Sequence, residues 1–228
     1  MSLSEIMLFV ATAIIFVFTV LVFRRYFAHR TANLLLWGIG LVLYGIGTLT
    51  AALYASSGFS ELGFRLWYLC GAMLVAAYLG QGTIYLLVRR KIGGIKLAHI
   101  LMAVLLLASI CGAIVVFGAE LDPSQIQDDT LSGDAIVSSG VRGLTPFFNI
   151  YGTLFLVGGA LYSAWIFWRK RVMRHRVIGN VLIAAGAMLV AASGTSSRFG
   201  SSEWLYLGEL AAAMLMFIGF LEASRREE

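Results

Sequence analysis

The sequence has few charged residues, and it contains only two prolines and two cysteines. Charged side chains make up 13% of its 228 residues, whereas they make up about a quarter of a soluble domain. Hydrophobic side chains make up 60%, and the mean hydropathy is +0.87. A soluble fold of this composition would lack the polar surface needed to cover its apolar side chains. The shortage of charge therefore excludes a soluble globular protein and indicates an integral membrane protein.

The scarcity of cysteine and histidine argues against metal and cofactor sites. Cys70 and Cys111 lie in apolar runs without CxxC spacing, so we expect two small buried residues instead of a disulfide. His29, His99 and His175 lie near the ends of apolar runs and lack the spacing of metal ligands. No cluster of acids, bases and nucleophiles is typical of an active site. We therefore expect no enzymatic activity and no cofactor.

Seven apolar runs are each long enough to cross a bilayer, which takes about 20 residues per helix. In lipid a helix satisfies its own backbone hydrogen bonds, so apolar runs of this length are stable there as helices. The sequence therefore predicts an all-α, polytopic membrane protein with one seven-helix domain over residues 1–228. The predicted runs are approximately 3–23, 32–55, 66–88, 97–119, 146–168, 177–195 and 204–222.

Basic residues are distributed unequally between the ends of these runs. Fourteen of the 17 arginines and lysines follow runs one, three, five and seven. Lys and Arg near helix ends tend to stay cytoplasmic, so we expect the N-terminus outside and the C-terminus inside a cell (inner) membrane. The other three, Arg65, Arg142 and Arg198, lie at the outer ends. We attribute the basic inner face to topology and to contact with anionic lipids, not to nucleic acid.

Two pairs of runs match each other in sequence. The segment Asn33–Thr48 of run two and the segment Asn180–Thr195 of run six both begin with Asn and end with Gly-Thr. Runs three and seven share a Trp, two Gly and an Ala at equal spacing. Runs one to three thus echo runs five to seven in the same orientation, which predicts a 3+1+3 parallel repeat. Its parts are repeat one (about 1–90), a linker helix (about 97–119), a solvated outer loop (about 120–145) and repeat two (about 146–226).

The three-plus-one-plus-three layout is similar to that of the SWEET and PQ-loop families, and seven helices with the N-terminus outside resemble the microbial rhodopsins. Neither Pro123 nor Pro146 is followed by Gln, so the proline-glutamine signature is absent. Run seven offers no lysine for a retinal Schiff base, since the only lysines are Lys91, Lys96 and Lys170. The resemblance therefore implies topology alone and transfers no functional residues.

One carboxylate, that of Glu209, lies inside the last apolar run. An ionisable side chain at membrane depth usually faces the interior of the bundle. Two interpretations remain open. In the first, Glu209 pairs with Arg65, Arg142 or Arg198 as a structural clamp for the last helix. In the second, Glu209 belongs to an outward-facing polar vestibule that binds a cation, a proton or a small polar ligand.

The vestibule interpretation includes further polar residues of neighbouring runs. Gln81 of run three is the other uncommon polar residue. In the alignment of the repeats, Gln81 matches Ile218 and Glu209 matches Ala72, so both departures from symmetry are polar. Such departures are expected of a site added to a duplicated scaffold. The remaining members are Asn149, Tyr151, Thr48, Thr195 and Tyr206.

The site predicts a function less precisely than the apolar runs predict the architecture. We expect a transporter-like bundle that binds a small solute or ion in the vestibule. The alternative is a ligand-sensing or scaffold membrane subunit that signals through a partner on the cytoplasmic side. In either case we expect the bilayer itself, and either a protein partner or a second copy of the chain, to be the binding partners. A membrane enzyme acting on lipids is disfavoured because no cluster of acids or histidines lies on the inner face.

Overall fold

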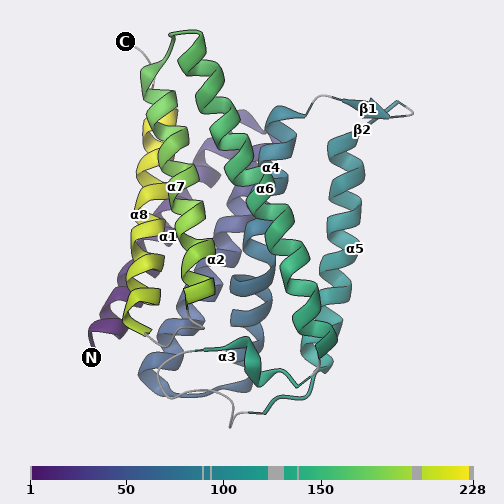
Figure 1. Cartoon of the computed structure of the whole chain (residues 1–228), viewed down its shortest axis with the longest axis vertical. Coiled ribbons are helices and arrows are strands. Elements are labelled where there is room, and N and C mark those ends of the chain that lie inside the picture. The colour runs from purple at the N-terminus through teal and green to yellow at the C-terminus, as the bar shows by residue number, and fades with distance from the viewer. Residues whose placement is uncertain are drawn as a thin grey trace.

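The computed structural model of the chain describes residues 2–88, 90–92, 94–122, 131–137, 139–196 and 202–225, without the side chains of 139, 193–196 and 202–204. Nearly all of these residues are helical, and seven helices are long and apolar enough to cross a membrane (Figure 1). The all-α prediction with seven such helices is therefore confirmed. The helices are α1 (Leu3–His29), α2 (Ala32–Ser57), α3 (Glu61–Leu66) continued by η1 (Trp67–Leu74) and α4 (Val75–Leu87), α5 (Leu97–Gly118), α6 (Ser139–Arg169), α7 (Arg174–Ser196) and α8 (Ser202–Ser224).

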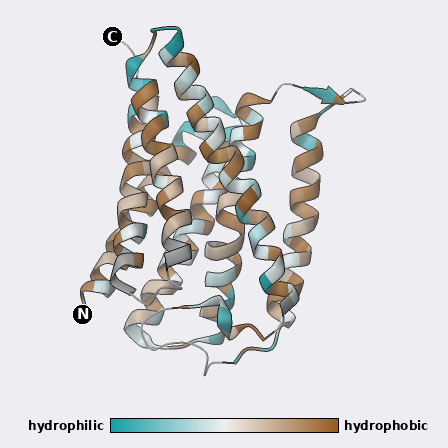
Figure 2. Ribbon diagram, viewed as in Figure 1, coloured by the Kyte–Doolittle hydropathy of each residue, from teal (hydrophilic) through white to brown (hydrophobic). Residues whose placement is uncertain are grey.

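Polar residues lie mainly at the two ends of the bundle, and apolar residues cover the middle (Figure 2). Short polar connections end the first helices. The Ser2 hydroxyl accepts the N–H of Glu5 and caps α1. Arg30 ends α1 in the left-handed conformation at φ 51°, and Gly58 follows α2 at φ 83°. These abrupt ends leave α1, α2 and α3 as antiparallel neighbours.

Six of the membrane spans form a closed ring. Contacts run from α1 to α2, from α2 to η1 and α4, from α4 to α6, and then from α6 through α7 and α8 back to α1. The most extensive contact joins α7 and α8. α5 stands outside this six-helix ring and touches α4, η1 and α6 only sparsely (Figure 1). The ring therefore encloses an interior, and α5 flanks it.

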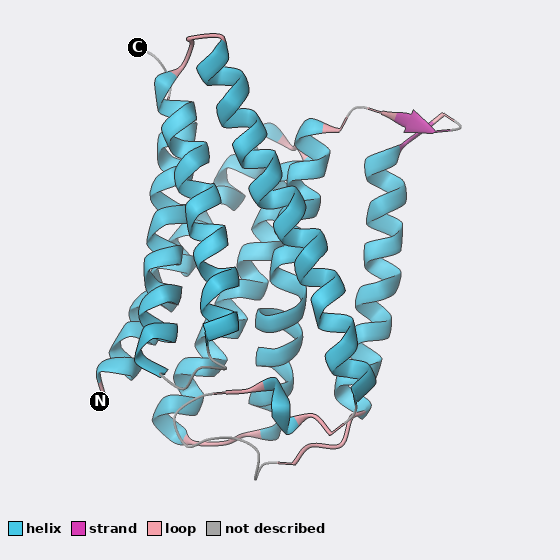
Figure 3. Cartoon of the chain, viewed as in Figure 1, coloured by secondary structure: helices cyan, strands magenta, loops and turns pink. Residues whose placement is uncertain are grey.

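The two connections of α5 both contain structure that the sequence analysis did not predict. On one side a β-hairpin, β1 (Lys91–Ile92) and β2 (Ile95–Lys96), joins α4 to α5 and projects sideways (Figure 3). On the other side, the described part of the outer loop is not a solvated cap. Leu121 pairs with Ile136, and Ile136 is 1% exposed. The apolar side chains of this loop explain the difference, because they are buried against the end of the third span.

α6 also begins earlier than predicted. It starts at Ser139, so Pro146 lies inside the helix and not at its first residue. Pro146 is the eighth residue of α6, beyond the first turn, so its missing N–H removes the helical hydrogen bond to the carbonyl of Arg142. The hydroxyl of Thr145, next to this proline, is hydrogen-bonded to the hydroxyl of Tyr68 at 2.8 Å. This bond joins the first turns of α6 to η1.

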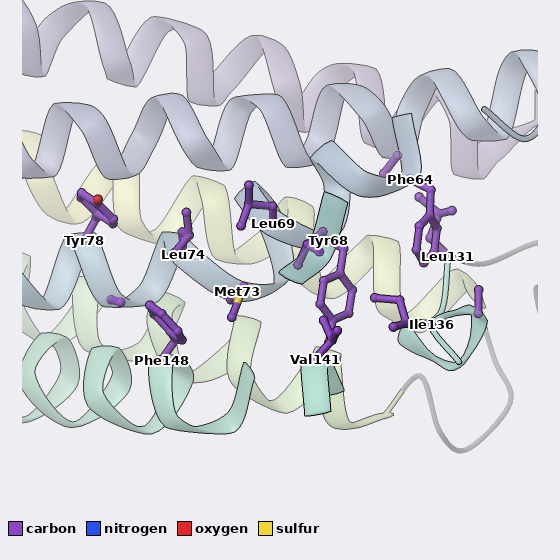
Figure 4. Close-up of a cluster of buried hydrophobic side chains, with 14 of the residues drawn as sticks. Phe64, Tyr68, Leu69, Met73, Leu74, Tyr78, Leu131, Ile136, Val141 and Phe148 are labelled. Carbon is purple, nitrogen blue, oxygen red and sulfur yellow. The ribbon is translucent and has the colours of Figure 1, made fainter. Parts of the chain in front are cut away.

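Buried apolar side chains fill the space within and beside the ring. One cluster joins Phe64 and Tyr68 of the third span to Phe148 of α6 and to Leu131 and Ile136 of the outer loop (Figure 4). A second cluster contains side chains from all six spans of the ring. Its members include Phe18, Tyr44, Leu79, Leu156, Ile183 and Met216. Among the described residues, the interior of the ring is thus packed with apolar side chains.

Glycine permits the closest helix crossings. A Cβ added at Gly152 of α6 would lie 2.1 Å from the main-chain carbon of Ala76 in α4. One added at Gly47 of α2 would lie 2.6 Å from the Cα of Gly71 in η1. Neither crossing has room for any side chain. Small residues are therefore needed where the ring backbones touch, as is usual between membrane helices.

The third span contains a π-helix that the sequence did not predict. η1 covers eight residues between two α-helical segments. π-helices are rare, usually last a single turn and frequently lie at functional sites. The Asn149 side chain of α6 donates through Nδ2 to the carbonyl oxygen of Ala72 within η1 at 3.0 Å. This contact and the Gly47–Gly71 crossing hold η1 from two sides.

Candidate functional site

Glu209 lies on the buried face of α8. The residues one turn away on this face, Leu205, Tyr206, Ala212 and Ala213, are between 0% and 9% exposed. Glu209 itself is only partly buried. Glu209 therefore lies on the side of α8 that packs against the rest of the bundle.

Glu209 is also distinct in its position along the membrane. Every other Asp or Glu of the described residues lies in the first or last three residues of a helix, or outside the helices that span the bundle. Within the described ranges, the Glu209 carboxylate forms no hydrogen bond and no ion pair. The carboxylate can therefore accept a hydrogen bond or bind a cation.

Tyr44 of α2 contacts α8 at Glu209 from across the ring. Its hydroxyl donates to the main-chain oxygen of Glu209 at 3.5 Å, and its side chain is buried. α2 and α8 are separated around the ring by α1, so this bond crosses the interior. Tyr206, predicted as a member of the vestibule, is buried one turn before Glu209. We call Glu209 and Tyr44 the Glu209 site.

Sequence reasoning missed Tyr44, although a signal was present. Tyrosine in membrane helices is enriched at the interfaces. Tyr44 lies in the middle of α2, Ala32–Ser57. A tyrosine at that depth needs a hydrogen-bond partner inside the bundle, and this need marks it as a site candidate.

Arg65 lies elsewhere and stabilises the end of α5. Its guanidinium pairs with Glu61 at 2.7 Å, and it donates to the carbonyl oxygens of Val116 and Ala119. The last carbonyls of a helix lack intrahelical partners and carry partial negative charge, which a cation stabilises. The Glu61–Arg65 spacing of four residues favours such a pair on one helix face. Arg65 therefore does not form a clamp with Glu209.

Replacing Arg65 tests this capping role. Arg65→Met should lower the free energy of unfolding by about 2 kcal/mol, because two carbonyls lose a charged donor whose side chain is 11% exposed. Glu61→Gln is the matched control and should change stability by less than about 0.5 kcal/mol, since Glu61 is exposed. Unfolding in detergent titrations measures both values. Equal losses in the two variants would assign the effect to the ion pair instead of the cap.

The other predicted arginines do not meet Glu209 among the described residues. Arg142 pairs with Asp134, and both side chains are largely exposed. Arg198 lies outside the described residues, as does the side chain of Thr195. Three arginines were considered as partners of Glu209 in the clamp. The two that the structure describes, Arg65 and Arg142, pair with other acids.

Gln81 and Asn149 form a second polar group between α4, α5 and α6. The Gln81 side chain, 0% exposed, donates through Nε2 to the carbonyl oxygen of Ala98 in α5 at 2.8 Å. Its Oε1 accepts the hydroxyl of Tyr151 in α6. Asn149, as noted, binds η1. These hydrogen bonds join the third span to α5 and α6 and involve no residue of α8.

The predicted vestibule therefore separates into two parts. Glu209 and Tyr206 lie on α8, and the main-chain oxygen of Glu209 accepts the Tyr44 hydroxyl, whereas Gln81, Tyr151 and Asn149 satisfy one another or nearby carbonyls. Thr48 bonds back to the carbonyl oxygens of Tyr44 and Gly45 in its own helix. A satisfied buried network stabilises a fold, while an unpaired carboxylate is free to bind. The Glu209 site is thus the stronger candidate for function.

The chain was compared with models of known protein families, with curated proteins and with solved structures, and none of them matches it.

Proposed function

We propose that the chain is a transporter-like membrane bundle that binds a small cation at the Glu209 site. A single observation carries this proposal: Glu209 lies on a buried helix face and has no counter-charge among the described residues. An uncompensated charge at membrane depth is costly and usually functional. A small bound cation supplies the missing charge, and the Tyr44 hydroxyl lies against the main chain at the same position of α8.

The proposed orientation has the N-terminus outside and the C-terminus inside a cell (inner) membrane. Fourteen of the 17 basic residues fall at the proposed inner ends, and this bias supports the assignment. Glu209 is then nearer the outer face, because α8 begins at Ser202 on that side. In this orientation the Glu209 site is filled from outside, and the inner face meets anionic lipids and not nucleic acid.

The proposed 3+1+3 repeat gains support from the order of contacts. α1 touches α2 and α2 touches the third span, as α6 touches α7 and α7 touches α8. The contact of α4 with α6 then corresponds to that of α8 with α1. Gly82 lies against Asn33 and Trp37 of α2, and its matched residue Gly219 lies against Gly179 and Ile183 of α7. A two-fold relation between the halves, with α5 as the connector, accounts for all of these contacts.

A sensing or scaffold subunit without enzymatic activity is the second candidate. The apolar cluster from all six ring spans favours it, because this packing leaves the interior closed beyond the Glu209 site. In that case cation binding shifts the ring between two packings, which a protein partner or second copy at the inner face detects.

Reconstituted vesicles distinguish the two candidates. The full chain is placed in liposomes that contain indicators for sodium, potassium or protons, and in parallel its thermal unfolding is followed with each ion. Transport predicts both a thermal shift and uptake above that of empty liposomes for the same ion. A shift without uptake favours sensing. Absence of both contradicts a cation site at Glu209.

A further inference from the structure

The hairpin between α4 and α5 has two chemically different faces. Its strands pair Lys91 with Lys96 and Ile92 with Ile95 in antiparallel register. Directly opposed residues share one face of such a pair, and successive residues alternate between faces. The lysines therefore occupy one face and the isoleucines the other. Ile92 is 50% exposed and Ile95 is 57% exposed.

No other described element of the chain covers this hairpin. Its contacts are between its own strands and with the start of α5. An isolated two-stranded hairpin is marginal in water, and like charges directly opposite one another destabilise it further. The arrangement is stable only where negative charge meets the lysines and apolar material covers the isoleucines.

The position of the hairpin identifies the material that meets both needs. It projects sideways from the ends of α4 and α5, two helices that cross the membrane (Figures 1 and 3). A segment that runs sideways at the end of a membrane helix lies along the headgroup layer. There isoleucines reach the acyl boundary, and long lysine side chains extend to phosphates.

We propose that the β1–β2 hairpin is an anchor for anionic phospholipid headgroups. Lys91 and Lys96 bind the phosphates, and Ile92 and Ile95 enter the acyl boundary beneath them. The anchor holds α5, which has sparse contacts with the ring, against the bilayer surface. This inference is independent of the ligand at Glu209.

Amide hydrogen exchange tests the anchor on the full chain in nanodiscs. Exchange of the peptide 88–97 is compared in pure phosphatidylcholine and in a mixture with phosphatidylglycerol. The wild type should exchange more slowly in the anionic nanodiscs. In the double variant Lys91→Gln, Lys96→Gln, the slowing of exchange by anionic lipid should be about 30-fold smaller than in the wild type. This factor corresponds to about 2 kcal/mol at 1.4 kcal/mol per factor of ten. Unchanged helix protection elsewhere shows that the variant is folded.

The matched control removes two charges from another basic connection. Lys170→Gln with Arg171→Gln, in the turn between α6 and α7, should leave hairpin protection unchanged. Equal exchange of the wild-type hairpin in both nanodiscs would overturn the proposal, as would a double lysine variant that keeps its lipid dependence. A third outcome would also overturn it: hairpin exchange that is unaffected by phosphatidylglycerol but slowed by soluble poly-glutamate would indicate an acidic protein partner.

Discussion

Replacing Gly152 with alanine should lower the free energy of unfolding by about 4 kcal/mol. The added methyl carbon would lie 2.1 Å from the main-chain carbon and 2.3 Å from the carbonyl oxygen of Ala76. These are backbone atoms, so no rotamer change relieves the overlap, and α4 and α6 must separate. Separation would also disturb the Gln81–Tyr151 bond that joins these helices. The midpoint of thermal unfolding in detergent should fall by about 10 °C.

Gly158 provides a control within the same helix. A Cβ at this position meets no atom within 4 Å. Gly158→Ala should therefore leave packing intact and stabilise α6 by up to about 1 kcal/mol, because alanine loses less backbone entropy than glycine. If both substitutions changed the midpoint by similar amounts, helix propensity and not the α4–α6 crossing would govern stability here.

Replacing Glu209 with glutamine should abolish cation-dependent stabilisation and uptake. Glutamine keeps the size and the acceptor oxygen of the side chain but removes its charge, so cation affinity should fall by at least about 30-fold, equivalent to about 2 kcal/mol. Because Glu209 has no ion-pair partner among the described residues, the unfolding midpoint without added cation should change little. Thermal shift and liposome uptake measure the two effects separately.

Two further variants make this result specific. Glu222→Gln removes another carboxylate of α8, which pairs with Arg225 near the end of the helix, and should preserve the cation response. Glu209→Asp keeps the charge but withdraws it by one methylene, so it should retain a weakened response. A Glu209→Gln protein that unfolds as readily as Gly152→Ala would support the structural clamp instead of a binding site.

The sequence predicted the membrane helices because their signal is local. Apolar runs of about 20 residues mark them directly. Errors arose where the signal was not hydrophobicity: α6 continues upstream of Pro146, and β1–β2 occupies a short basic connection. No residue pattern in the sequence marks the eight-residue π-helix. It depends on contacts with Asn149 and Gly47 of other helices.

The site was harder to predict than the fold. Glu209 stood out as a carboxylate in an apolar run, but its neighbours depend on the order of helices around the ring. In lipid, apolar surface does not specify which helices meet, so Asn149 and Gln81 were grouped with Glu209 although they bond within the α4–α6 region. Arg65 was considered a counter-charge for Glu209, whereas its partner Glu61 is four residues away on its own helix.

The contact between α1 and α8 also determines the order of assembly. α1 is synthesised before the five other spans of the ring and α8 after them, yet the two lie side by side. Until α8 inserts, the other five spans form an open arc, and α1 has a flank exposed to lipid. The two residues of the proposed cation site are also synthesised at different times, because Tyr44 lies in the second span and Glu209 in the last. The contact between the earliest and latest spans is thus the last interface to form, and the proposed binding site is complete only when that interface has formed.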